Sequence, residues 1–191
     1  MNRKVRYDER ISGYLLRDIG NYIDYRWADY SNRFKAIVAG KRTFNWQCAF
    51  FDSVWFAYRK MTLAAVISTI LNCLTFVLLT LALSINFRRM NMGMTDIVFY
   101  TGICVIGYLA LRICIYGRIG DKVYFRSVKR NLDSHNLKGR RSFSCAKLQH
   151  NLYREGGISI KALFGFLSLK VALIYITSVV CVFLGIMIRY Y

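Results

Sequence analysis

The apolar residues of this chain are gathered in long blocks rather than dispersed at the period of a soluble helix or strand. Residues 62–85 contain no charged side chain, and residues 95–116 and 162–188 form two further blocks. About 20 apolar residues suffice for a helix to cross the roughly 30 Å hydrocarbon core of a bilayer. The pattern therefore predicts an all-α integral membrane protein with three transmembrane helices, the first two paired as a hairpin over 62–116 and the third within 162–191.

Few charges interrupt these blocks. Asp96 and Arg112 lie near the two ends of the second block, and Lys170 is the only charge in the third. We expect Arg112 to extend its long side chain to the headgroups. Asn72 and Ser68, in the first block, are expected to hydrogen-bond between helices, because polar groups inside a bilayer seek partners on neighbouring spans.

The amino-terminal segment, residues 1–43, has a different pattern. Apolar positions between residues 11 and 38 recur at helical spacing, which predicts one amphipathic helix that Gly40 ends. Its apolar stripe consists of Ile23, Trp27, Tyr30, Phe34, Ile37 and Val38. Two placements remain open for this helix, namely packing on the rest of the chain and docking on a membrane surface.

Residues 44–61 form an aromatic segment that fits neither a transmembrane helix nor a segment exposed to water. As a helix, residues 44–58 would be about 22 Å long, which is too short for a roughly 30 Å core. Apolar side chains would cover all its faces, so it should not lie in water. We predict a short interfacial or re-entrant helix, with Arg59 and Lys60 anchored in the headgroups.

Residues 117–161 are basic and connect the second and third spans. Their pattern predicts that the second span continues as a helix, followed by an exposed loop at residues 138–141. Phe143, Leu148 and Leu152 predict a short helix that ends at Gly156 and Gly157. Ser159 is expected to cap the third span.

Charge placement predicts an orientation. Residues 1–43 hold ten Lys and Arg and residues 117–161 hold eleven, whereas the loop between the first two spans holds two. Basic flanks stay in the cytoplasm, so the amino terminus is expected inside and the carboxyl terminus outside. The charged first forty residues do not resemble a signal peptide, so the first span is expected to direct insertion. We therefore interpret the net charge of +18 as a surface that binds anionic lipid headgroups rather than nucleic acid.

Two kinds of candidate site residue follow. The membrane-anchor or lipid-contact candidates are aromatic or basic residues beside the spans: Trp46, Trp55, Tyr58, Arg59, Lys60, Tyr124, Arg126, Lys129 and Arg130. Asp52 is the candidate buried polar residue, because it is the one carboxylate inside the aromatic segment. It is interpreted either as a proton or cation site or, preferably, as a headgroup-level residue paired with Arg59 or Lys60 or bonded to nearby amides.

The sequence offers little catalytic chemistry. His135 and His150 are the only histidines, and Cys145 stands five residues before His150, which does not suit a zinc set. The six cysteines include no C-x-x-C pair, and no G-x-S-x-G is present. Gly117-x-x-Gly120 lacks the third glycine of a dinucleotide loop. We therefore predict no enzyme, no cofactor and no metal.

The run YIDYRWADYSNRFKAIVAGKRTFNWQCAFFDSVWFAYRKM resembles the start of the bacterial "domain of unknown function 2628" family of small membrane proteins. The matching residues are Asn45, Trp46, Ala49, Phe50, Phe51, Trp55, Tyr58, Arg59, Lys60 and Met61. GDKVYFRSVKRNL and GGIS, with Tyr124, Arg126 and Val128 in step, are similar to later family segments, so the likeness covers roughly residues 22–165. Asp52-Ser53 replaces the family's Gly-Pro, and Ser127 replaces a histidine. The resemblance implies a bacterial plasma membrane and no particular activity.

These features predict a non-catalytic accessory, scaffold or partner-binding membrane component. Its basic cytoplasmic face would meet anionic lipid or a cytoplasmic protein, and a homo-oligomer is also open. The alternative is a small transporter or channel subunit, against which the complete lack of proline counts mildly. A membrane-embedded lipid enzyme and an immunity-type protein are further alternatives.

Overall fold

The computed structural model describes residues 9–90, 94–139 and 146–190. The chain is almost entirely helical, with one short antiparallel strand pair. The elements are β1 (Arg10–Ile11), β2 (Tyr14–Leu15), α1 (Leu16–Ile23), α2 (Trp27–Val38), α3 (Trp46–Tyr58), α4 (Thr62–Met90), α5 (Met94–Ser134), α6 (Ala146–Glu155) and α7 (Ile160–Tyr190).

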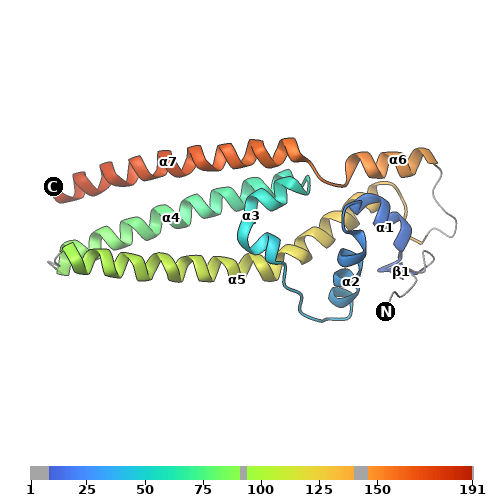
Figure 1. The fold of residues 1–191 in the computed structure, drawn as a ribbon, viewed down its shortest axis with the longest axis horizontal. Helices are drawn as coiled ribbons and strands as arrows, with labels where there is room; N and C mark the ends of the chain where they lie inside the picture. Colours follow the sequence, from blue (N-terminus) through green and yellow to red (C-terminus); the bar gives the residue numbers. More distant parts are fainter. Residues whose placement is uncertain (1–8, 91–93, 140–145, 191) are drawn as a thin grey trace.

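The molecule is long, with two distinct halves (Figure 1). In one half, α4, α5 and α7 run alongside one another. The other half, here called the head, consists of residues 9–44, 118–139 and 146–159, and it contains α1, α2, α6 and the last part of α5. Helix α3 lies where the two halves meet, and it packs against α4, α5 and α7.

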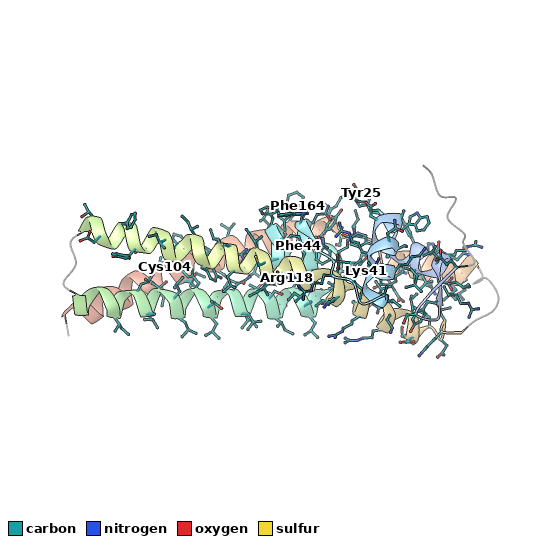
Figure 2. The ribbon with its side chains drawn as sticks, turned by 90° about the horizontal axis from the view of Figure 1, so that it is seen from below. Tyr25, Lys41, Phe44, Cys104, Arg118 and Phe164 are labelled. Carbon is teal, nitrogen blue, oxygen red and sulfur yellow. The ribbon has the colours of Figure 1, made fainter. Side chains whose placement is uncertain are left out.

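Three helices within the described residues are long and apolar enough to cross a membrane. The candidate spans are Thr62–Leu83, Phe99–Ser134 and Lys147–Val180. Their apolar side chains point outward, as Figure 2 shows around Cys104 and Phe164, and Tyr175 is 72% exposed. A helix that is apolar on all sides and still exposed suits lipid or another protein rather than water. The prediction of three apolar helices of spanning length is confirmed.

The prediction of one helix over residues 11–38 is wrong. Residues 10–15 instead form the β1–β2 hairpin, and the helical part is divided into α1 and α2 by Asp24–Arg26. Asp24 and Arg26 have positive φ angles of 57° and 60°, which no α-helix contains. The backbone of α1 ends there because distant groups take its carbonyls: Gly157 N donates to Tyr22 O at 2.7 Å, and Arg59 donates to Ile23 O at 3.4 Å.

Most of the apolar stripe of the amino-terminal segment packs inside the head, although Val38 at its end is exposed. Tyr30 and Phe34 of α2 are buried against Tyr124 and Phe125 of α5, with Tyr30 and Tyr124 ring centroids 5.2 Å apart. The sequence left open whether this segment packs on the rest of the chain or docks on a membrane surface. In the structure it packs on the rest of the chain. Burial of these rings stabilises the head, because aromatic side chains remove large apolar areas from water.

The segment between the second and third spans follows the predicted course. Helix α5 continues without a break to Ser134, and α6 ends at Glu155 just before Gly156 and Gly157. Ser159 caps α7, since its Oγ accepts from Ala162 N at 3.2 Å. Lys138 and Gly139 of the predicted loop are exposed, while Phe143, Cys145 and residues 140–141 lie outside the described residues.

Candidate functional site

Helix α3 is broken in its middle, at Asp52. Its φ and ψ angles of 37° and −112° are far from helical values, although the sequence contains no proline. The Asp52 carboxylate accepts from the backbone N–H and the hydroxyl of Ser53, the latter at 2.7 Å. A side chain that bonds the following amide competes with helical hydrogen bonding, which explains the break without a proline. The helix is therefore kinked at Asp52-Ser53, the position where the resembled family has Gly-Pro.

The break directs Asp52 toward two cations from different helices. Arg112 of α5 forms an ion pair with Asp52 Oδ2, and Lys170 Nζ of α7 lies 2.7 Å from Oδ1 and 2.9 Å from Oδ2. Asp52 is 0% exposed, whereas the Arg112 and Lys170 side chains are 19% and 20% exposed. We call these three residues the ion triad. It joins α3, α5 and α7.

The triad corrects two predictions. Asp52 was expected to pair with Arg59 or Lys60 or to bond nearby amides, and Arg112 was expected to extend toward headgroups. The bond to the Ser53 amide is present, but the cations that pair with Asp52 are Arg112 and Lys170. Neither Arg59 nor Lys60 contacts Asp52, because both lie beyond the break and turn toward the head. A buried carboxylate needs a partner that balances its charge, and two helices supply one each.

A cavity of about 210 Å³ adjoins the two cations between α4, α5 and α7. Arg112 and Lys170 line it and Asp52 does not. The rest of its lining is mostly apolar, with Phe76, Leu79, Val105, Leu109 and Ile174 among the residues. A second cavity of about 470 Å³ lies between α4 and α5 and shares Asn72, Tyr108 and Arg112 with the first.

Asn72 bridges two helices beside both cavities. Tyr116 Oη of α5 donates to Asn72 Oδ1 at 3.1 Å, so the predicted interhelical hydrogen bond of Asn72 is confirmed. Ser68 takes part only through its backbone carbonyl, which Tyr116 approaches at 3.4 Å. The other amide atom, Asn72 Nδ2, is buried and finds no hydrogen-bond partner among the described residues. An unsatisfied buried donor of this kind calls for an explanation.

A second buried carboxylate, Asp121 of α5, lies at the start of α3. Asn45 Nδ2 donates to Asp121 Oδ1 at 2.7 Å, and Arg33 Nη1 lies 3.2 Å from Oδ2. Asn45 also caps α3, since its Oδ1 accepts from Cys48 N at 3.0 Å. We call Arg33, Asn45 and Asp121 the capping cluster. It holds the first turn of α3 against α5.

The pair Gly117 and Gly120 has a packing role at this contact. A Cβ on Gly117 would collide with the Phe44 ring, and one on Gly120 would lie 2.5 Å from Cys48 Sγ. Gly117 O accepts from Asn45 N at 2.8 Å. The two glycines therefore let α3 approach the backbone of α5.

Arg59, Trp55 and Tyr124, three of the predicted lipid contacts, are buried within the protein. Arg59 is 2% exposed, and its guanidinium lies 4.5 Å from the Tyr30 ring centroid and 5.3 Å from that of Tyr124. Trp55 packs on Tyr124 with centroids 5.7 Å apart, and both are buried. The aromatic faces and the carbonyls of Ile23 and Tyr25 compensate the buried cation.

The other predicted contact residues remain at least partly accessible. Trp46 is exposed, Tyr58 is half-buried, and Lys60 donates to Arg154 O at 2.8 Å. Lys129 lies over the Phe125 ring, with Nζ 5.7 Å from its centroid. Arg126 and Arg130 are exposed. Together with Lys60 they border a groove of about 410 Å³ between the start of α4 and the last part of α5, here called the basic groove.

The histidines and cysteines form no further site in the described part of the chain. His135 Nε2 lies 2.8 Å from a carboxylate oxygen of Glu155, and His150 is exposed. No group of three His, Cys, Asp or Glu suitable for a metal ion occurs among the described residues. The described cysteines, namely Cys48, Cys73, Cys104 and Cys114, are free thiols, while the side chains of Cys145 and Cys181 lie outside the description.

Comparisons with protein-family models, with curated proteins and with solved structures find no match to this chain. The resemblance to the bacterial membrane family stays a prediction. The ion triad is the part of the site that sequence reasoning missed. A signal existed, since Asp52 and Lys170 are the only charges of residues 44–58 and 162–188 and Arg112 is the only charge of residues 97–116, and opposite charges in apolar surroundings attract one another.

Proposed function

We propose that the protein is a three-span component of a bacterial plasma membrane with a non-catalytic accessory, scaffold or partner-binding role. In this proposal the head lies in the cytoplasm, α3 is a re-entrant helix, and the end of α7 faces outward. The proposal is supported by three apolar helices of spanning length that leave one head, and by the excess of Lys and Arg on that side.

The basic groove is the observation that carries this proposal. Lys60, Arg126 and Arg130 border it, while Met61, Leu63 and Val123 provide an apolar floor. It lies where α4 begins, on the side of the molecule that carries the head. Cations around an apolar floor suit an anionic lipid headgroup or an acidic, partly apolar segment of a cytoplasmic protein.

The lipid half is tested with the full chain in phosphatidylcholine vesicles that contain spin-labelled phosphatidylglycerol. The double variant Arg126→Gln/Arg130→Gln is expected to lower the motionally restricted fraction of the labelled lipid, and added salt should lower it in the parent chain. The matched control is Lys41→Gln/Arg42→Gln, which removes two exposed charges of the head outside the groove. Equal fractions in parent and groove variant contradict the lipid half.

The protein half is tested by a photoreactive residue at position 126 in native membranes. Crosslinks to one defined cytoplasmic protein are expected there and not from a photoreactive residue at position 41. A loss of that crosslink in the Arg130→Gln background would tie the partner to the groove. Equal crosslinking from both positions contradicts a groove-specific partner.

A small transporter or channel subunit is the second candidate, and the ion triad favours it. Broken helices form the ion and substrate sites of many transporters, and α3 is broken at the charged residue Asp52. Ion flux in proteoliposomes that Asp52→Asn abolishes would support this candidate. Absence of flux from the parent chain at several lipid compositions would eliminate it.

A further inference from the structure

We infer that the cavity between α4, α5 and α7 is a binding site for one anionic phospholipid, with the phosphate on Arg112 and Lys170 and one acyl chain along the cavity. The inference rests on the proposed membrane placement. It concerns a site separate from the basic groove, since the two share no lining residue.

The charge that faces the cavity is positive. Arg112 and Lys170 line it. Asp52, the only carboxylate paired with them among the described residues, is buried and does not line the cavity. Two cations and one carboxylate leave a net charge of +1 among apolar helices. A charge in such surroundings is costly unless a counter-charge approaches it, so a monoanionic group is the complement.

A third donor points to the same place. Asn72 lines the cavity with Arg112 and Lys170, and its Nδ2 is one of the buried donors without a partner in the described chain. A residue with a guanidinium, one with an ammonium and one with an amide therefore line the same cavity. A phosphate diester offers enough acceptor oxygens for all three, and arginine binds phosphate oxygens in pairs.

The remaining lining fits an acyl chain. The cavity follows α4 from Thr69 to Leu79, which is about 15 Å at 1.5 Å per residue. This length equals half of the roughly 30 Å hydrocarbon core, and it is therefore the span of one acyl chain within one leaflet. A soluble anion would have no use for the apolar wall of Phe76, Leu79 and Leu109.

Depth and direction agree with a lipid of the cytoplasmic leaflet. Arg112 lies about 24 Å along α5 from Asp96, and Lys170 lies about 30 Å along α7 from its end at Tyr190. The cations are thus near the inner boundary of a roughly 30 Å core. The cavity runs from them away from the head, so a phosphate there points its chain toward the bilayer centre.

The test is native mass spectrometry of the delipidated full chain in detergent, titrated with phosphatidylglycerol or phosphatidylcholine. One phosphatidylglycerol adduct is expected, with an affinity at least about tenfold above that for phosphatidylcholine. Lys170→Met should lower the phosphatidylglycerol affinity about tenfold while keeping the Asp52–Arg112 pair. Lys161→Met, an exposed residue of the same helix, is the matched control and should leave it unchanged.

Two further variants separate binding from folding. Cys73→Phe fills the cavity without altering any charge and should remove the adduct. Asp52→Asn removes the competing carboxylate and should strengthen binding, provided that its thermal unfolding midpoint shows a folded chain. A structural role of the triad alone predicts that Asp52→Asn and Lys170→Met weaken binding alike, and that result overturns the inference.

Equal affinity for both phospholipids, an unchanged adduct in Cys73→Phe, or displacement by equimolar oleate also overturns it, the last by assigning the cavity to a fatty-acid carboxylate. The experiment needs no bilayer, and Arg126→Gln/Arg130→Gln should keep the adduct. Failure of the basic groove is therefore distinguishable from failure of this site.

Discussion

Two buried carboxylates, Asp52 and Asp121, lie at the two ends of the contact between α3 and α5, and their surroundings differ. Asp121 meets one guanidinium and one amide, and its cluster is balanced in charge and closed by packing. Asp52 meets two cations whose other sides line an apolar cavity. The difference teaches that burial of an acid alone does not mark a ligand site. A charge excess beside unfilled space does.

Removal of each carboxylate should give the largest effects and sharpen this contrast. Asp52→Leu leaves two cations without their counter-ion in apolar surroundings, so we expect it to lower the free energy of unfolding by about 3–5 kcal/mol. Asp121→Leu should lower it by about 1–3 kcal/mol, because Arg33 reaches water with its 35% exposed side chain while only the Asn45 amide is stranded. Unfolding in detergent by denaturant titration measures both.

The control for this pair is Asp52→Leu combined with Lys170→Met. It removes one of the stranded cations and should recover part of the lost stability. Equal losses for Asp52→Leu and Asp121→Leu, without recovery in the double variant, would erase the distinction between the two acids.

The sequence predicts the spans much better than it predicts the site. Span length depends only on runs of apolar residues, so residues 62–85 suffice to predict most of α4. The partners of Asp52 depend on how α5 and α7 are placed, and nothing local to residue 52 contains that information. Arg59 shows the same limit, because its burial is decided by Tyr30 and Tyr124, which lie far away in the chain. The break at Asp24 was missed because a distant glycine amide supports it.

A packing variant probes the balanced end of α3 with a smaller effect. Gly117→Ala places a methyl group against the Phe44 ring, and we expect a loss of about 1–3 kcal/mol in the free energy of unfolding. The three heavy atoms nearest to this methyl group all belong to the Phe44 ring. In a Phe44→Ala background the same change should therefore have little effect. An undiminished loss there would mean that the capping cluster, rather than the ring, sets the distance between α3 and α5.

A third acid, Asp133, extends the comparison to an exposed carboxylate and gives the smallest effect. Tyr14 Oη donates to Asp133 Oδ1 at 2.5 Å, and burial together with this carboxylate raises the pKa of Tyr14 from 10.0 to about 12. Between these values the unfolded chain has lost the phenolic proton and the folded chain still holds it. The contribution of Tyr14 is therefore complete below about pH 10 and declines as the pH rises toward 12.

Tyr14→Phe removes the hydroxyl and should lower the free energy of unfolding by about 1 kcal/mol near neutral pH, since Asp133 regains water. The difference between parent and variant should shrink from pH 10 to 12, as measured by denaturant titration at each pH. A difference that stays constant over this window would show that the phenol titrates alike in both states. That result would contradict the raised pKa of Tyr14 and the part that Asp133 plays in it.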